Sequence, residues 1–286
     1  MKAGIVGLPN VGKSTLFNCL SNAKAQSANF PFCTIEPNIG IVNVPDLRLE
    51  KLDELVNPKR VLPATVEIVD IAGLVKGASK GEGLGNQFLG NIRETDAILH
   101  VLRCFDDDNI IHVDGSIDPI RDKETIDIEL QLKDLETADK KLEKVKRAAR
   151  TGNKDAQKEE TALIKVKEGL EAGISVRAIE LTDSERDDFI DVVQFITDKP
   201  VMYVCNVDET SAVSGNKYVE KVKAAVANES AEVIFLAVGT ESDINELEEY
   251  EERQMFLEDL GLEEAGSAKL IRGAYRLLNL QTYFLY

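Results

Sequence analysis

The fold of this chain is decided near its N-terminus by the segment Ala3-Gly4-Ile5-Val6-Gly7-Leu8-Pro9-Asn10-Val11-Gly12-Lys13-Ser14-Thr15. Residues 7–14 match the pattern G-x-x-x-x-G-K-[ST] in full, between an apolar strand and a helix. In such a loop, backbone N–H groups surround the phosphates, the lysine reaches the β- and γ-phosphates, and the hydroxyl that follows it binds Mg²⁺. The segment therefore predicts a P-loop nucleoside triphosphatase with the nucleotide-binding residues Gly7, Asn10, Val11, Gly12, Lys13, Ser14 and Thr15.

Short β-branched runs separated by helix-like stretches continue along the chain. They lie at residues 3–6, 39–44, 66–71, 98–102, 201–205 and 233–237. This alternation indicates a mostly parallel α/β sheet, in which ligands bind beyond the carboxyl ends of the strands. With 286 residues, 43% of them hydrophobic, the chain is long enough for such a core and an insertion.

The alternation of strands stops in the middle of the chain, where a helical pattern replaces it. Apolar residues repeat at spacings of three and four over 135–145 and again over 163–170, after a polar break at 151–153. We therefore expect an antiparallel helical coiled-coil arm inserted in the nucleotide-binding domain. The predicted boundaries are 1–127 and 199–274 for the discontinuous P-loop domain and 128–198 for the arm.

Charge limits the partners of this protein. The formal net charge of −17 repels nucleic acid at long range, so no direct DNA binding is expected, and RNA contact requires a local basic patch. The arm offers such a patch, in which six basic residues surround the single acid Glu143. They are Lys140, Lys141, Lys144, Lys146, Arg147 and Arg150. This patch is either a solvated coiled-coil face or a surface that contacts RNA or the ribosome.

Neither a membrane nor an oxidising compartment is indicated. No apolar run approaches the roughly 20 residues of a membrane span, and the N-terminus lacks a signal-peptide pattern, so we expect a cytoplasmic protein. Four cysteines without a CxxC pair argue against zinc and against disulfides, and three of them are expected to fill the core. Cys33 alone lies near residues with predicted chemistry.

Two further segments contain candidate ligands for Mg²⁺. Asp70 ends an apolar strand in Val69-Asp70-Ile71-Ala72-Gly73, where a Walker-B-type carboxylate holds the ion, usually through water. Thr34 lies in a turn-rich loop between the two motifs. A loop threonine followed by D-x-x-G is the switch arrangement of GTPase-like hydrolases rather than of P-loop kinases. The predicted metal ligands are therefore Ser14, Thr34 and Asp70.

The base-reading motif of GTPases is altered. Those proteins read guanine with Asn-Lys-x-Asp at a later strand end, where this chain has Asn206-Val207-Asp208-Glu209. Guanine offers two donors to a short carboxylate, whereas adenine presents a ring acceptor and an exocyclic amine that Asn206 or a backbone carbonyl can accept. We therefore expect base contacts from Asn206, Val207 and Glu209, with ATP preferred and GTP binding more weakly.

The residue that orients the attacking water is not evident. Leu74 stands after Gly73, where many Ras-like enzymes carry a glutamine, and leucine cannot perform that role. His112, in the loop over residues 105–118, is the histidine on a predicted loop near the carboxyl edge of the sheet, although a lone loop histidine is usually inert. Asn10 is a weaker candidate for ligating a K⁺ ion that replaces the charge of an arginine finger.

Together these residues resemble the YchF family of Obg-related ATPases, known as ribosome-binding ATPases. The likeness extends from Lys2 to about Phe284 and is carried by the segments 7–15, 30–38, 70–75, 81–86 and 206–209. The resemblance implies an adenine-preferring site, a coiled-coil arm, slow hydrolysis, and binding to the ribosome or its large subunit. It also implies that His112 is catalytic, because the family's proposed catalytic histidine lies in a similar loop.

The C-terminal residues are interpreted through the same resemblance. Family members continue past Phe284 into a β-rich TGS domain, so residues 275–286 are expected to be the start of a domain that is absent from this chain. A GTP hydrolase with a tolerant base pocket is one alternative function. A nucleotide-gated binding module, whose hydrolysis is incidental and whose arm contacts the partner, is the other.

Overall fold

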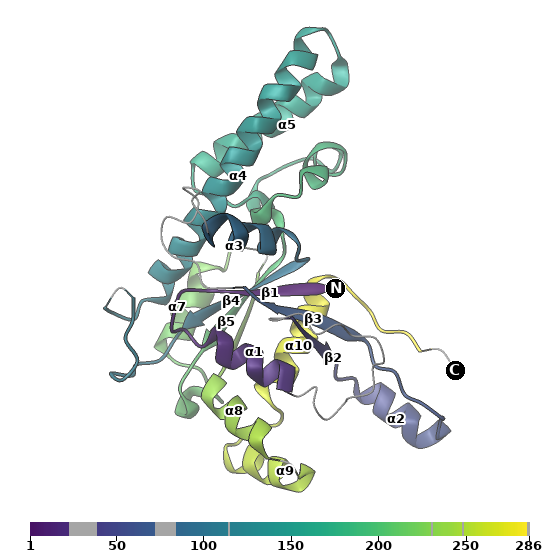
Figure 1. The fold of residues 1–286 in the computed structure, drawn as a ribbon, viewed down its shortest axis with the longest axis vertical. Helices are drawn as coiled ribbons and strands as arrows, with labels where there is room; N and C mark the ends of the chain where they lie inside the picture. Colours follow the sequence, from purple (N-terminus) through teal and green to yellow (C-terminus); the bar gives the residue numbers. More distant parts are fainter. Residues whose placement is uncertain (23–38, 72–83, 114, 230, 248, 285–286) are drawn as a thin grey trace.

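A six-stranded sheet forms the centre of the protein, with the strand order β2-β3-β1-β4-β5-β6 (Figure 1). The computed structural model describes residues 1–22, 39–71, 84–113, 115–229, 231–247 and 249–284. The strands are β1 (Lys2–Val6), β2 (Ile39–Asn43), β3 (Thr65–Asp70), β4 (Ala97–Arg103), β5 (Val201–Asn206) and β6 (Glu232–Leu236). Only β2 is antiparallel to its neighbour. The predicted α/β fold with a mostly parallel sheet is confirmed.

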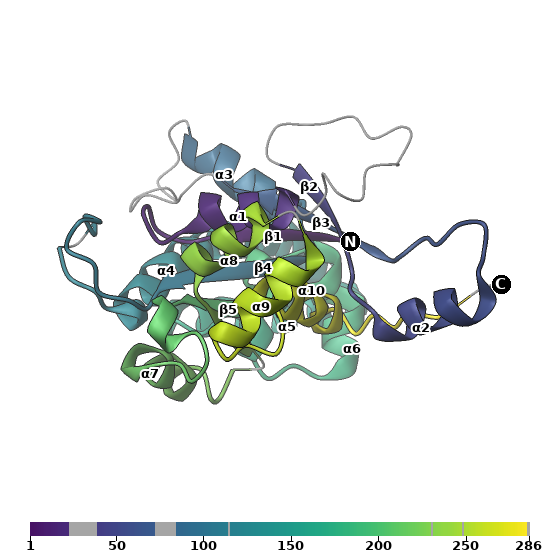
Figure 2. The same ribbon diagram turned by 90° about the horizontal axis from the view of Figure 1, so that it is seen from below.

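Helices cover both faces of this sheet. α1 (Lys13–Asn22), α8 (Val238–Glu246) and α10 (Gly266–Leu277) lie on one face, and α3 (Leu84–Arg93) with the first part of α4 (Pro119–Arg150) lies on the other (Figures 1 and 2). The other α-helices of the described residues are α2 (Leu47–Val56), α5 (Lys154–Glu171), α6 (Asp183–Glu185), α7 (Lys217–Ala225) and α9 (Tyr250–Asp259). Because β4 and β5 are covered on both sides, every residue of these two strands is buried.

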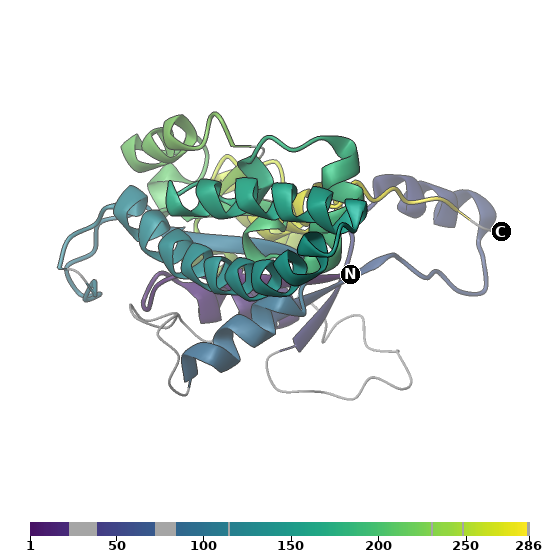
Figure 3. The same cartoon turned by 90° about the horizontal axis from the view of Figure 1, so that it is seen from above.

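The inserted arm is an antiparallel pair of helices, α4 and α5, as Figure 3 shows from above. The two helices are joined by a short turn in which Gly152 has a φ of 87°. The Asn153 side chain accepts hydrogen bonds from the backbone N–H groups of Asp155 and Ala156 and so caps α5. Their shared apolar seam includes Ala138, Leu142, Val145, Ala149, Ala162, Leu163, Val166 and Leu170. The spacing of three and four along the sequence thus corresponds to a real helical hairpin.

The root of the arm belongs to the main domain. The predicted boundary at residue 128 falls inside α4, and Ile126 and Leu130 pack into the core around the sheet. Farther along, the buried carboxylate of Asp134 accepts hydrogen bonds from the backbone N–H groups of Ile196 at 2.9 Å and Thr197 at 2.6 Å. These bonds fasten α4 to the segment that leads into β5.

Three of the four cysteines lie in the core of the protein. Cys19, Cys104 and Cys205 are buried free thiols, as expected for core residues. The predicted boundary at residue 275 falls inside α10, where Tyr275 packs partly buried against the main core. Within the described residues, no helix has the length and apolar character needed to cross a membrane.

Candidate nucleotide-binding and hydrolysis site

The phosphate-binding loop lies between β1 and α1, at the carboxyl edge of the sheet. Its conformation requires glycine at two positions, since Gly7 has a φ of 154° and Gly12 a φ of 98°. A Cβ atom on Gly7 would lie 2.5 Å from the carbonyl oxygen of Val101, and one on Gly12 would lie 2.5 Å from Nδ2 of Asn206. Asn10 also has a left-handed backbone, with a φ of 63°. These constraints explain the glycine positions of the motif.

Lys13 is held against the loop from which it would bind phosphate. Its Nζ donates a hydrogen bond of 2.7 Å to the carbonyl oxygen of Leu8, and the residue is buried. Burial lowers the pKa of Lys13, while the nearby carboxylate of Asp70 opposes this shift. A phosphate oxygen is a stronger acceptor than a carbonyl, because a charge-assisted hydrogen bond is about twice as strong as a neutral one. Lys13 is therefore placed to exchange its carbonyl partner for a phosphate.

Ser14 and Asp70 lie side by side, as the sequence predicted for Mg²⁺ ligands. Ser14 Oγ donates to Asp70 Oδ2 across 3.4 Å. The pairing of β1 with β3 brings them together, because Asp70 is in register with Ile5, two residues before the phosphate loop. Mg²⁺ takes oxygen ligands and retains several waters. This hydroxyl and carboxylate fit an ion that is bound directly by Ser14 and through water by Asp70.

Asn206 braces the phosphate loop. Its Nδ2 donates to the carbonyl oxygen of Val11 at 3.0 Å, and its Oδ1 accepts from the backbone N–H of Val238 at 3.1 Å. The residue is 5% exposed. Both ends of the amide thus hold backbone groups, one in the phosphate loop and one at the start of α8. This geometry favours a positioning role for Asn206 over the predicted contact with adenine.

The other residues of the altered base reader differ in exposure. Val207 is buried, and its N–H donates to the carbonyl oxygen of Leu236 at 3.1 Å. Asp208 caps the short turn that follows, accepting from the N–H of Ser211 at 3.0 Å, and the hydrogen bond from the Thr210 hydroxyl lowers the pKa of Asp208. Glu209 is exposed. Its side chain has no hydrogen-bond or ion-pair partner among the described residues.

His112 lies beside the phosphate loop but is buried. Asn10 Nδ2 donates to the carbonyl oxygen of Ile111 at 3.2 Å, so the phosphate loop contacts the residue immediately before His112. The His112 side chain is 4% exposed, and its Nε2 lies 2.8 Å from Oδ2 of Asp122 in the first turn of α4. In the sequence, Asp122 is an ordinary acidic residue in the first turn of a helix. Its pairing with His112 could therefore not be predicted from the sequence. The catalytic role of His112 stays a prediction.

Some predicted site residues lie outside the described part of the chain. They are Thr34, Cys33, Gly73 and Leu74. The predicted third Mg²⁺ ligand, Thr34, therefore has no structural description. The remaining predicted residues meet at one edge of the sheet.

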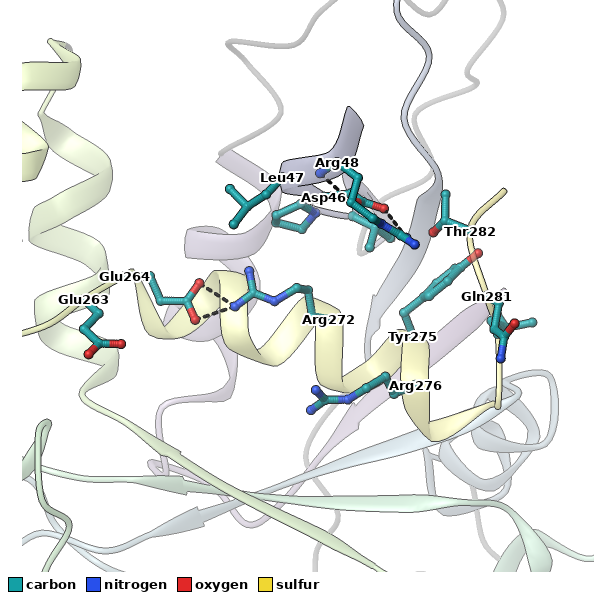
Figure 4. A pocket seen from close by; sticks show the side chains of 13 residues that line it. Asp46, Leu47, Arg48, Glu263, Glu264, Arg272, Tyr275, Arg276, Gln281 and Thr282 are labelled. Atoms are coloured by element: carbon teal, nitrogen blue, oxygen red, sulfur yellow. Dashed lines mark hydrogen bonds and ion pairs between the residues drawn. The ribbon is translucent and has the colours of Figure 1, made fainter. Parts of the chain in front are cut away.

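A surface pocket of about 780 Å³ lies elsewhere, between the start of α2 and α10 (Figure 4). Four of its charged side chains form two ion pairs, since Arg272 binds Glu264 and Arg48 binds Asp46. None of the phosphate-loop residues lines it. This pocket is therefore separate from the candidate nucleotide site.

Comparison with known proteins supports this arrangement. Residues 2–141 match the family described as 50S ribosome-binding GTPase. The ribosome-binding ATPase YchF of Bacillus subtilis is 54% identical over 286 residues, covering 99% of this chain and 78% of the relative. The protein of the same description from Escherichia coli O157:H7 is 53% identical over 283 residues, covering 99% of this chain and 77% of the relative.

A solved structure has the same fold. It is described as the Schizosaccharomyces pombe YchF GTPase, is 37% identical, covers 98% of this chain and 76% of that protein, and superposes with a TM-score of 0.85. These relatives match this chain over almost its whole length. The matched part includes the phosphate loop, the Ser14 and Asp70 pair, and the helical arm. On these grounds the protein belongs to the YchF family.

Proposed function

We propose that this protein hydrolyses ATP to ADP and phosphate with Mg²⁺. The observation that carries the proposal is the convergence of Lys13, Ser14 and Asp70 at the carboxyl edge of the sheet. Backbone amides of the loop and Lys13 neutralise the charge of the β- and γ-phosphates, and Ser14 with Asp70 holds the metal ion. Thr34 is proposed to complete the metal site, and His112 to orient the water.

ATP is proposed as the preferred nucleotide because the guanine reader is incomplete. Buried Val207 replaces the lysine of the guanine reader, and the amide of Asn206 is bound to backbone on both sides. Glu209 is exposed and longer than the aspartate that binds two guanine donors. The relatives' names disagree, since the bacterial proteins are called ATPases and the yeast structure a GTPase. Specificity must therefore be measured on this chain.

Calorimetric titration of nucleotide-free protein with ATP and with GTP, each with Mg²⁺ at matched salt, is expected to show tighter ATP binding. A GTP affinity tenfold above that for ATP, a difference of about 1.4 kcal/mol, would refute the preference.

Hydrolysis measured in potassium and in sodium salts tests Asn10 as a K⁺ ligand. Equal rates in the two salts would remove the monovalent ion from the proposal.

The proposed partner is the ribosome or its large subunit, in the cytoplasm, contacted through the arm. The relatives' names and the family description support this partner. Two of the six basic residues in the predicted patch form ion pairs with acidic residues of the arm. Lys140 pairs with Glu136, and Lys141 pairs with Glu159. Lys144, Lys146, Arg147 and Arg150 form no ion pair with any described residue. These four residues are the unneutralised charges of the patch.

Replacing Lys144, Arg147 and Arg150 together with alanine is expected to weaken binding to isolated large subunits by roughly 10-fold or more. The salt dependence should also become shallower, by roughly one unit of logarithmic slope for each lost phosphate contact. Co-sedimentation across a salt series, with ADP and with a non-hydrolysable triphosphate, measures both effects. The control is Lys140→Ala with Lys141→Ala, since these lysines are already paired. Equal losses in the two variants would contradict a specific role of the unpaired charges.

A further inference from the structure

We infer that Asp122 is a positioning residue that sets the orientation and tautomer of the His112 ring. The inference rests on the proposed hydrolytic function, and it assigns a task to a residue outside the nucleotide-binding motifs. The Asp122 side chain is 1% exposed, and its Oδ2 lies 2.8 Å from Nε2 of His112. A carboxylate bound to one ring nitrogen of a metal-binding histidine fixes the tautomer and orientation of that ring, and the Asp122 pair has the same geometry.

The carboxylate of Asp122 is oriented from both sides. Its Oδ1 accepts from Nε of Arg121 at 3.2 Å and from an Nη of Arg121 at 3.0 Å. Arg121 is itself fixed, because it donates to the hydroxyl of Ser116 at 2.8 Å and to the Ser116 carbonyl oxygen at 2.7 Å. One oxygen of Asp122 therefore faces the guanidinium, and the other faces the imidazole.

The helix that carries Asp122 is also firmly placed. The Asp118 side chain caps α4 by accepting from the N–H groups of Ile120 and Arg121. One turn later, buried Lys123 binds Asp127 at 2.7 Å and Glu229 at 2.8 Å. The contact with Glu229 thereby ties the first turns of α4 to the main domain. Asp122 is thus presented to the loop by a rigid element, as a positioning residue requires.

The chemistry of the pair selects one tautomer. An ionised carboxylate accepts hydrogen bonds and donates none, so Nε2 of His112 must carry a proton to bind Asp122. In the neutral ring the acceptor nitrogen is then Nδ1. A ring held in this form can take a proton from water only through Nδ1. Asp122 therefore determines which ring atom can act on the proposed nucleophile.

An amide at position 122 cannot serve both partners. Its oxygen accepts, but its NH₂ group donates and would oppose either Arg121 or a protonated Nε2. Since the Arg121 guanidinium cannot lose its protons, the amide oxygen is expected to face Arg121 and the NH₂ group to face His112. Asp122→Asn should therefore move the imidazole proton to Nδ1 with little change in shape.

The test compares Asp122→Ala, Asp122→Asn and His112→Ala, alone and combined, with Asp127→Asn as the control. Asp127 is a carboxylate of the same helix that binds Lys123 instead of His112. Each variant is assayed for ATP affinity by titration, for kcat in single- and multiple-turnover assays, and for thermal unfolding. Long-range ¹H–¹⁵N spectra report the imidazole tautomer, and only two histidines occur in the chain. Burial lowers the pKa of His100 to about 4, and the spectrum of His112→Ala identifies the signals of His100.

Asp122→Ala and Asp122→Asn are expected to lower kcat by roughly 10- to 100-fold, the range seen when the partner that orients a metal-binding histidine is removed. ATP affinity should stay within about threefold, and neither variant should lower kcat further in the His112→Ala background. Asp127→Asn should retain the rate, because Lys123 still binds Glu229 and keeps α4 in place. If Asp122→Ala fails to fold, the nearly isosteric Asp122→Asn carries the test.

Two results would overturn the inference. One is an unchanged kcat and tautomer in Asp122→Asn, and the other is a full additional loss when Asp122→Asn is added to His112→Ala. Both leave the proposed function intact if His112→Ala alone is slow. An unchanged rate in His112→Ala would instead remove the role of His112 itself, so failure of the inference and failure of the proposed function can be distinguished.

Discussion

Lys13→Ala is expected to weaken ATP binding roughly 100-fold and to lower kcat by roughly 1,000-fold, because it removes the one side-chain cation built into the phosphate loop. The loss in affinity follows from a charge-assisted contact to the β- and γ-phosphates. The larger loss in rate follows because the charge on these oxygens is redistributed in the transition state, where preorganised donors contribute most. Titration with ATP and single-turnover hydrolysis measure the two effects separately.

The control for this variant is Lys51→Ala, because Lys51 is an exposed lysine of α2 that pairs only with Glu54. It should bind and hydrolyse ATP like the unmodified protein. Lys13→Ala also deprives the Leu8 carbonyl oxygen of its partner, so thermal unfolding has to be compared as well. Normal unfolding together with unchanged ATP affinity would show that Lys13 does not reach the phosphates.

The phosphate loop was predictable because its requirements are local. Gly7 and Gly12 are demanded by backbone angles and by close atoms, so the amino-acid type itself reports the conformation. Strands β1, β4 and β5 were predictable for a similar reason, since buried parallel strands are short and continuously apolar. The antiparallel direction of β2 was not, because strand direction depends on partners that are distant along the chain.

The roles of Asn206 and His112 show where local reasoning ends. Asn206 contacts Val11, which is 195 positions earlier, and that contact converts a residue of the base reader into a brace for the phosphate loop. His112 pairs with Asp122, a residue of α4. The sequence pattern placed the start of the arm at residue 128 and gave no sign that this helix begins earlier, beside His112. Apolar periodicity marks the seam of a coiled coil, but it does not show where a long helix leaves the main domain.

His112→Ala is expected to lower kcat by roughly 100-fold or more while ATP affinity changes little, since a positioned acid–base group contributes about 10²- to 10⁴-fold. The position of its loop supports this size of effect, because Asn10 of the phosphate loop contacts Ile111 directly. Binding should be nearly unaffected, because none of the described phosphate-loop hydrogen bonds uses the imidazole. Single-turnover hydrolysis and titration with a non-hydrolysable triphosphate separate rate from affinity.

The matched control is Ile111→Ala, which changes the neighbouring side chain, 80% exposed, and keeps the backbone carbonyl that Asn10 binds. If this variant were as slow as His112→Ala, the effect would come from the shape of the loop. An unmodified rate in His112→Ala would remove its assignment. The His112 side chain is only 4% exposed, so a catalytic His112 that keeps its bond to Asp122 requires its loop to shift as ATP binds. Faster exchange of loop amides in the nucleotide-free protein than with the triphosphate analogue would be the sign of that rearrangement.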